Sequence, residues 1–298
     1  MSGGAITIIG PGRMGLAIGG ALAEGDNAIR LLYFGRHPEP PGHPLFTQGR
    51  AEYVFGLEAI RAGTRAVLIA VPDAVIPEVA FSLAALGPAP QGCVAFHLSG
   101  RLPTDVLEPL HERGFAVGSF HPMQAVSNPI RGAERMRGSF VAIEGGPEAA
   151  SMGRTIADAM GAHTLTVPSA RKPLFHAAST LASSYLLPLL DLSVRVMERA
   201  GVSSADAVPA LISLVRGTLD SVEEGGVPAA LGGPISMGDV EGVSLHLRAL
   251  EPEDAHLYAL IGLEVLRIGD HALDDRRLVE LTELLQRYAD LETTPSGI

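Results

Sequence analysis

At 298 residues the chain is long enough for one large domain or two ordinary ones, and 47% of its residues are hydrophobic. Its net charge of −11, with no basic block, argues against partners such as nucleic acid or an anionic membrane. The one cysteine, Cys93, cannot form an internal disulfide, and the scattered histidines indicate no metal site. There is no basic segment of the kind that starts a signal peptide, and no unbroken apolar run approaches the roughly 18 residues of a membrane span. We therefore expect a soluble, cytoplasmic protein.

A glycine motif near the start of the chain is its most informative feature. Residues 6–9 form a short apolar run, which leads into G-x-G-x-x-G and then into residues that favour a helix. In such a motif Gly10 allows a tight turn, Gly12 lets the backbone approach a pyrophosphate, and Gly15 lets the helix pack on the strand. The helix N-terminus would offer free N–H groups to the phosphates. The motif alone would fit a glycine-rich turn, but its context favours a dinucleotide site made by Gly10, Pro11, Gly12, Arg13, Met14 and Gly15.

The segment after the next apolar run indicates which dinucleotide is preferred. Residues 31–34 read as a second strand, and an NAD-binding protein usually places Asp or Glu just after it, where the ribose 2′-hydroxyl lies. Here Gly35 and Arg36 follow instead, and the first acidic residue is Glu39. An arginine fork can pair with a 2′-phosphate, and Gly35 would leave room for the adenine ribose. We therefore expect NADP as the cofactor; the alternative is a solvated loop arginine.

Apolar runs alternate with helix-compatible stretches over the first half of the chain. The runs predict strands near residues 5–9, 30–34, 51–55, 66–71, 93–97, 115–119, 138–144 and 163–167. The stretches between them predict helices near residues 13–24, 56–62, 74–86, 102–113 and 147–160. This alternation is typical of an α/β fold, here a Rossmann-type, doubly wound and mostly parallel sheet. We assign residues 1–168 to this dinucleotide-binding domain.

Residues 169–298 have a different character, because helical patterning dominates there. The patterning predicts helices near residues 174–199, 204–224, 239–250, 252–272 and 275–290, a smaller all-helical domain for substrate binding and dimerisation. Pro173 suits the start of the first helix, and Pro188 should kink it. Long apolar helices are costly to expose, so we expect a homodimer formed through this domain. Residues 38–44 and the tail after residue 291 are expected to be poorly ordered.

Ligands of an open α/β sheet bind at the carboxyl ends of the strands, so the residues just after each strand are the candidates. Val71, Pro72 and Asp73 follow the fourth predicted strand and are candidate cofactor contacts, although Asp73 would serve equally as a helix N-cap. Ser99 and Gly100 follow the fifth. They would present a hydroxyl and an N–H to the nicotinamide or to a substrate carboxylate, or form an ordinary turn.

Two histidines are the candidate acid–base groups. His121 precedes a proline, which holds it extended at a strand end, and imidazole exchanges protons near neutral pH. The alternative for His121 is a structural hydrogen bond to a backbone carbonyl. His176 lies on a helix-periodic polar stripe that would line either a cleft or a polar domain interface. On an ideal helix the stripe spans about 80°; its members are His176, Thr180, Ser183 and Asp191, with Ser184 close by.

These motifs, in this order, resemble a family of NADP-dependent oxidoreductases with an N-terminal Rossmann domain and a C-terminal helical domain of unknown function. The resemblance covers nearly the whole chain and extends to pyrroline-5-carboxylate reductase, 6-phosphogluconate dehydrogenase and ketopantoate reductase. It rests on residues 10–15, 71–73, 97–100, 120–124, 175–178 and 233–239. Residues 121–123 are also similar to the histidine motif of prephenate dehydrogenase. Two positions depart from the family, which often has Asn where Ser184 stands and Arg where Met237 stands, so substrate contacts are expected to differ.

The resemblance implies an oxidoreductase that transfers a hydride to or from a small, carboxylate-bearing carbonyl, imine or alcohol. A ketopantoate-like 2-oxo acid is the first substrate to consider, and a non-catalytic NADP-binding redox sensor is the alternative. In the catalytic relatives a lysine on the first long helix of the second domain donates the proton. Here His176 occupies the comparable region and Lys172 lies just before the predicted helix. The residue positions and the resemblance together leave His176, His121, Lys172 and Ser99 as candidate catalytic groups, with Ser99, Gly100, Thr180, Ser183 and Ser184 toward the substrate.

Overall fold

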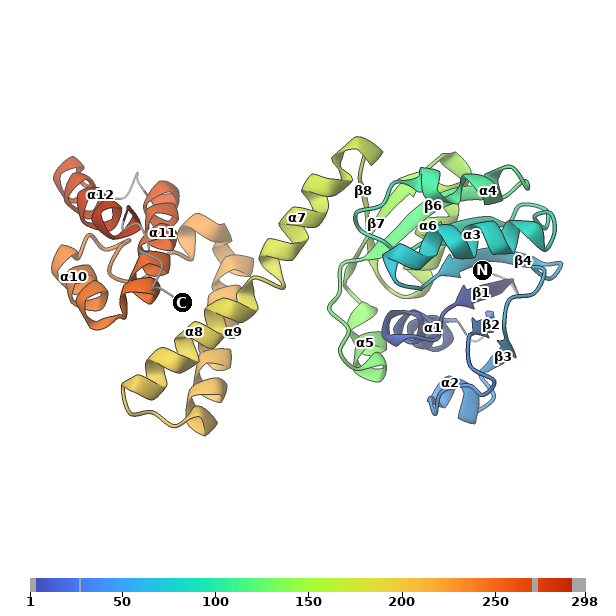
Figure 1. Ribbon diagram of the computed structural model, residues 1–298, viewed down its shortest axis with the longest axis horizontal. Coiled ribbons are helices and arrows are strands. Elements are labelled where there is room, and N and C mark those ends of the chain that lie inside the picture. Colours follow the sequence, from blue (N-terminus) through green and yellow to red (C-terminus); the bar gives the residue numbers. More distant parts are fainter. Residues whose placement is uncertain (1–3, 27, 270–272, 291–298) are drawn as a thin grey trace, which may run out of the picture. The chain divides into compact units, whose positions relative to one another are not determined.

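The computed structural model describes residues 4–26, 28–269 and 273–290, and these fall into two compact units. The first unit is Met1–Ser183 and the second is Ser184–Ile298. The sequence analysis placed the domain boundary at residues 168/169, whereas the contacts place the first helix after the linker with the first unit. Figure 1 shows the elements of both units.

One eight-stranded sheet organises the first unit (Figure 1). The strands are β1 (Ala5–Ile9), β2 (Arg30–Gly35), β3 (Ala51–Phe55), β4 (Thr64–Ile69), β5 (Val94–His97), β6 (Ala116–Pro122), β7 (Phe140–Gly145) and β8 (His163–Thr166). Their order is β3-β2-β1-β4-β5-β6-β7-β8, and every neighbouring pair is parallel except β6 and β7. The predicted Rossmann-type, mostly parallel sheet is confirmed. The chain order reverses between β1 and β4, and such switch points are where open sheets bind ligands.

Helices cover both faces of this sheet because successive strand residues point to opposite faces. The helices are α1 (Arg13–Gly25), α2 (Pro44–Thr47), α3 (Ile76–Ala85), α4 (Glu108–His111), α5 (Pro129–Met136), α6 (Pro147–Ala159) and α7 (Lys172–Ala182). Short 3-10 turns are η1 (Asp73–Val75), η2 (Thr104–Leu107) and η3 (Ser169–Arg171). Ile8 packs in the cluster that includes α1, α5 and α6, whereas Ile9 packs in the cluster that includes α3 and α4.

Three helix predictions were wrong. Residues 56–62 form no helix, and the glycines at the two ends of this segment, Gly56 and Gly63, take positive φ angles that a right-handed helix does not contain. Helix α5 was not predicted, although Asn128 caps it by accepting hydrogen bonds from two backbone N–H groups and Pro129 follows. The predicted helix over residues 174–199 is broken into α7 and α8 (Leu186–Arg199). The proline ring at 188 cannot accommodate the carbonyl four residues earlier, so the break falls one turn before it.

The second unit is all-helical, as predicted. It contains α8, α9 (Ser204–Ala229), α10 (Val240–Ala249), α11 (Pro252–Gly269) and α12 (Asp275–Ala289). Side chains of α10, α11 and α12 form its buried core, including Val243, Ala259 and Leu285. Helix α9 bends at Gly226, whose φ of 77° is open to glycine. The predictions for residues 270–272 and for the tail after residue 291 lie outside the described residues.

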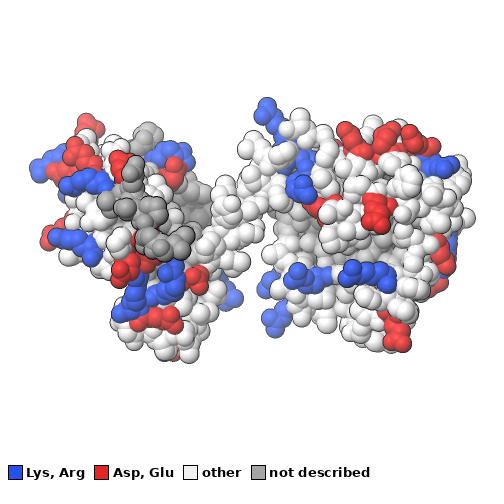
Figure 2. All heavy atoms as spheres, in the orientation of Figure 1, with Lys and Arg blue, Asp and Glu red and all other residues white. Residues whose placement is uncertain are grey.

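Helix α7 is poor in charged side chains. On the face drawn in Figure 2, acidic and basic side chains are interspersed over both units. Helix α7 carries no charged residue after Lys172, and Leu174 and Leu181 on it are exposed.

The stretch Ser169–Arg199 is long and apolar enough to cross a membrane, judged by length and composition alone. The sequence analysis did not identify it, because it considered only unbroken apolar runs. One such stretch is weak evidence for a span, because helices of soluble proteins pass the same test.

Candidate cofactor and catalytic site

The glycine turn lies between β1 and α1, at the switch point of the sheet. Gly10 has a φ of 101°, and a β-carbon there would lie 2.5 Å from the Ala70 carbonyl oxygen. A β-carbon on Gly15 would lie 2.3 Å from the Gly10 carbonyl oxygen. The fold itself therefore requires glycine at both positions.

Gly12 differs from the other two glycines of the turn. Its φ of −80° suits any residue, and a β-carbon there would meet no described atom within 4 Å. No protein contact explains this glycine, so the open space beside it at the N-terminus of α1 fits a bound phosphate. Arg13 begins the helix and is exposed, whereas Met14 is half-buried against the core. Pro11 is half-buried in the turn.

Arg36 lies just beyond the end of β2 and is exposed. Within the described residues it makes no ion pair, so its guanidinium is available to an anion. The adjacent Gly35 has a structural reason that the sequence analysis did not foresee. A β-carbon there would lie 2.3 Å from the Tyr53 hydroxyl oxygen, and that hydroxyl donates to the His37 carbonyl oxygen at 2.5 Å. Gly35 thus makes room for Tyr53, which holds the loop that carries Arg36.

A polar cluster joins the ends of β4 and β5. The Ser99 hydroxyl donates to Asp73 Oδ2 at 2.8 Å and accepts from the backbone N–H groups of Arg101 and Leu102. Asp73 Oδ2 also pairs with Arg101 Nε at 2.9 Å. Asp73 makes no N-cap hydrogen bond in η1, so the capping alternative is wrong. Pro72 precedes that turn and is exposed, and Val71 packs against Gly10. The single hydroxyl hydrogen of Ser99 is engaged by Asp73, and its side chain is buried.

His97 is a structural group that the sequence analysis did not identify. It is fully buried; its Nε2 lies 3.2 Å from the Pro103 carbonyl oxygen, and its Nδ1 accepts from the Ser99 N–H. A carbonyl only accepts, so the ring is the neutral tautomer with hydrogen on Nε2. Burial and the positive charge of Lys172 lower the pKa of His97 to about 4.

We expect His97 to make the stability of the protein sensitive to acid. Above pH 6.5 the ring is neutral in both the folded and the unfolded chain. Between pH 6.5 and about 4 only the unfolded chain takes up the proton, so the free energy of unfolding should fall by about 1.4 kcal/mol per pH unit. Urea unfolding across this range measures the loss. His97→Gln should remove that part of the slope; an unchanged slope would show that His97 is not its source.

His121 is held through one of its two ring nitrogens. Its Nδ1 lies 2.9 Å from the Leu98 carbonyl oxygen, so Nδ1 carries the hydrogen and the neutral ring leaves Nε2 as an acceptor. Burial is the main cause that lowers the pKa of His121, which keeps the neutral form populated below pH 6.5. The predicted alternative, a bond to a backbone carbonyl, is therefore present, and it fixes the ring with Nε2 as its acceptor nitrogen.

His176 lies beside His121. Their ring centroids are 6.3 Å apart, and a β-carbon on Gly100 would lie 2.8 Å from both His121 Nε2 and His176 Cδ2. The two imidazoles therefore pack over Gly100, which needs to be glycine to admit them. All three residues belong to the first unit.

The other residues of the predicted polar stripe do not form one continuous polar face on a single helix. The Thr180 hydroxyl donates to the His176 carbonyl oxygen, and the Ser183 hydroxyl donates to that of Ser179, so both bond back to their own helix. Ser183 and Ser184 are exposed where α7 ends, and Asp191 lies on α8. The proposed substrate contacts of these three hydroxyls stay predictions.

Lys172 is buried at the start of α7 with only 3% of its surface exposed. Its ammonium lies 3.0 Å from Glu144 Oε2, 2.6 Å from Ser119 Oγ and 3.4 Å from the Ser99 carbonyl oxygen. Burial lowers the pKa of Lys172 despite the opposing charge of Glu144. Burial alone would raise the pKa of Glu144, but hydrogen bonds from Thr104 and Lys172 outweigh it and hold that pKa low. This ion pair ties α7 to the ends of β5, β6 and β7.

Glu144, Ser119 and Arg101 were missed from the sequence. Arg101 follows β5, which is the positional signal that singled out Ser99. Ser119 lies within β6 and Glu144 lies on the antiparallel β7, so the strand-end rule does not find these two. Beside Lys172, Glu144, Ser119 and His121 lies a cavity of about 10 Å3, enough for roughly one water. The space beside the Lys172 ammonium therefore has room for little more than this one water molecule.

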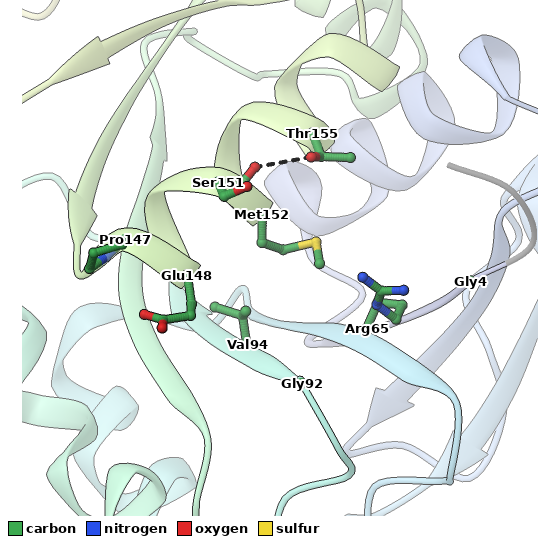
Figure 3. A pocket seen from close by; sticks show the side chains of 9 residues that line it. All are labelled: Gly4, Arg65, Gly92, Val94, Pro147, Glu148, Ser151, Met152 and Thr155. Atoms are coloured by element: carbon green, nitrogen blue, oxygen red, sulfur yellow. Dashed lines mark hydrogen bonds between the residues drawn. The ribbon is translucent and has the colours of Figure 1, made fainter.

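A larger pocket lies elsewhere (Figure 3), with a volume of about 550 Å3. It is bordered by Gly4, by Arg65 near the start of β4, by the start of β5 and by α6. These are the amino ends of β4 and β5, opposite the glycine turn, and the lining includes no histidine. The candidate site is therefore the carboxyl edge of the sheet rather than this pocket.

Comparison with known proteins agrees with this architecture. Residues 3–122 match the model of a Rossmann-like domain, and residues 139–265 match that of a domain of unknown function, DUF2520. No curated protein matches the sequence.

Three solved structures illustrate the likeness. Protein TM1727 from Thermotoga maritima has a TM-score of 0.64 at 21% identity, covering 95% of this chain and 98% of that chain. Pyrroline carboxylate reductase from Plasmodium falciparum with NADP bound has a TM-score of 0.58 at 13% identity, covering 97% and 98%. A reductive aminase from Aspergillus terreus, in complex with NADPH and ethyl-5-oxohexanoate, has a TM-score of 0.56 at 16% identity, covering 96% and 93%.

At these identities the likeness shows the fold. It confirms the resemblance drawn from the motifs: a Rossmann-like domain is followed by a DUF2520 domain, in a fold shared with NADP-dependent oxidoreductases.

Proposed function

We propose that this chain is an NADP(H)-dependent oxidoreductase acting on a small, carboxylate-bearing carbonyl, imine or alcohol. Gly12 carries the proposal, because packing requires glycine at positions 10 and 15, whereas at Gly12 the space beside the N-terminus of α1 is open and would admit a pyrophosphate. The bound cofactor would supply or accept the hydride. The protein would hold its pyrophosphate on the N-terminus of α1 and handle the substrate proton.

Arg36 would select NADPH over NADH by pairing with the 2′-phosphate. Its exposure beyond β2 and the lack of an acidic residue there support this role. Arg36→Ala should weaken NADPH binding by about 1.5–3 kcal/mol and leave NADH binding unchanged, since one charged hydrogen-bonded contact is lost. Calorimetric titration of both nucleotides measures the preference. Equal affinities in the wild-type chain, or a preference that survives the substitution, would exclude this role.

His121 and His176 would be the acid–base groups. His121 Nε2 is an oriented lone pair that accepts a proton from an alcohol in the oxidative direction, and the resulting imidazolium returns it in the reductive direction. His176 is the second candidate because it shares the space over Gly100 with His121. Lys172 and Ser99 are less suited to donate a proton to the substrate. The Ser99 hydroxyl already donates to Asp73, and the buried Lys172 ammonium already contacts Ser119 and Glu144.

A panel of 2-oxo acids and cyclic imines, beginning with ketopantoate-like compounds, tests the reaction by NADPH oxidation. His121→Gln should lower kcat by about 10²–10⁴-fold with NADPH affinity unchanged. The lowered pKa of His121 should place the acidic limb of kcat for alcohol oxidation below pH 6.5, because the base must be neutral. Activity that survives the substitution would exclude His121 from proton transfer.

A non-catalytic NADP-binding redox sensor is the second candidate. It would bind NADPH with the same dependence on Gly12 and Arg36 but has no need of an oriented imidazole. NADPH binding without turnover of any compound in the panel would favour it. The acceptor Nε2 over Gly100 favours the enzyme.

We further propose a homodimer of this cytoplasmic protein, whose partners are its own second copy and a small substrate, not nucleic acid or membrane. Large apolar side chains are exposed on α8 and α9, including Leu187, Leu214 and Leu219. Such surface is costly in water and suits a second copy. Light scattering on the purified chain should give twice 31.0 kDa; a monomer at micromolar concentration would contradict the dimer.

A further inference from the structure

We propose that Arg101 binds a carboxylate of the substrate, with Asp73 as the residue that positions it. This inference rests on the proposed oxidoreductase function and adds the residue that would select the substrate class.

Arg101 belongs to the turn over which the two imidazoles pack. Its backbone N–H donates to Ser99 Oγ at 3.3 Å, and it directly follows Gly100. A β-carbon on Gly100 would touch both His121 and His176. A group held by Arg101 is therefore held next to the proposed acid–base pair, at the carboxyl edge of the sheet.

The Arg101 guanidinium is oriented by one contact and keeps hydrogen-bond donors for a ligand. Asp73 Oδ2 engages its Nε at 2.9 Å and is itself held by the Ser99 hydroxyl at 2.8 Å. The Arg101 side chain is 55% exposed, and its two terminal nitrogens make no hydrogen bond within the described part of the chain. Those two nitrogens present the parallel donors that a planar carboxylate accepts. Because Asp73 already restricts the side chain, less rotamer freedom is lost when the carboxylate binds.

Charge favours an anion at this position. Both Lys172 and Arg101 contact Ser99. Lys172 is buried and paired with Glu144, so Arg101 is the accessible cation of the two. The Asp73 carboxylate partly offsets the charge of the guanidinium, so the parallel N–H donors, which match a planar carboxylate, define the class of anion more than the net charge does. The geometry thus points to a 2-oxo acid, an imino acid or the corresponding hydroxy acid.

Oxamate and oxamide provide a matched pair of probes, since they have similar size and only oxamate carries a carboxylate. The full-length chain is first titrated with NADP+, and the loaded protein is then titrated with each probe by calorimetry. We expect oxamate to bind and oxamide not to bind. Arg101→Gln should weaken oxamate binding by about 10- to 100-fold, and Arg101→Lys should recover only part of it. Arg154→Gln, which removes an exposed arginine on α6, is the matched control and should change nothing.

Three results would overturn the proposal: wild-type protein that does not bind oxamate, Arg101→Gln that binds it as tightly as wild type, or oxamide that binds equally well. A parallel loss of NADP+ affinity in Arg101→Gln would assign the residue to the cofactor site instead. Failure of the wild-type chain to bind NADP+ in the first titration contradicts the proposed function, and is thereby distinguished from failure of the carboxylate site.

Discussion

Gly12→Val should abolish NADPH binding while the protein stays folded. The added side chain would occupy the space in which a pyrophosphate lies, whereas no described protein atom comes within 4 Å of its β-carbon. The backbone at Gly12 is extended, so valine is accommodated without strain. Only the modest preference for glycine at a helix N-cap is lost, about 1 kcal/mol. Calorimetric titration with NADPH and urea unfolding measure the two effects separately.

Gly15→Ala is the matched control within the same motif. Its β-carbon would lie 2.3 Å from the Gly10 carbonyl oxygen, so the backbone has to shift and stability should fall by about 1–3 kcal/mol. The two substitutions thus separate a ligand space from a packing constraint. NADPH binding by Gly12→Val at wild-type affinity would show that the motif is only a turn.

Glu144→Gln should destabilise the protein by about 3–5 kcal/mol, because it leaves the Lys172 ammonium buried without its counter-charge. Lys172 is 3% exposed, and its remaining partners, Ser119 Oγ and the Ser99 carbonyl oxygen, are uncharged. Urea unfolding at neutral pH gives the loss. Since this ion pair anchors the start of α7, the variant should also increase hydrogen exchange at the amides around His176.

Combining Glu144→Leu with Lys172→Met tests the cause. The double variant removes both charges. Its loss in free energy of unfolding should therefore be smaller than the sum of the losses measured for Glu144→Leu alone and Lys172→Met alone. Additive losses, or a Glu144→Gln variant within about 1 kcal/mol of wild type, would mean that the pair contributes no more than a surface ion pair.

The sheet was predictable because its central strands, such as β1, β4 and β5, are buried on both faces. Each of the eight predicted strands overlaps an observed strand, and the position rule for strand ends directed attention to Asp73, Ser99 and His121. The start of α5 was also predictable, because Asn128 followed by Pro129 is a typical helix N-terminus. The sequence analysis overlooked this signal.

Pairings between distant residues were not predictable from one sequence. Lys172 and Glu144 lie 28 positions apart, and their contact depends on the antiparallel placement of β7 and on where α7 begins. The polar stripe assumed a continuous helix, and the break before Pro188 separated Asp191 from His176. The tautomer of His121 likewise depends on the Leu98 carbonyl, which only the folded loop brings to it.

A crystal structure of the chain with NADPH tests the central claim most directly. We predict the pyrophosphate at Gly12 on the N-terminus of α1, the 2′-phosphate against Arg36, and nicotinamide C4 within roughly 8 Å of the His121 or His176 imidazole, the reach of a hydrogen bond through one water and a substrate. A cofactor bound elsewhere, or both imidazoles beyond that distance, would contradict the account.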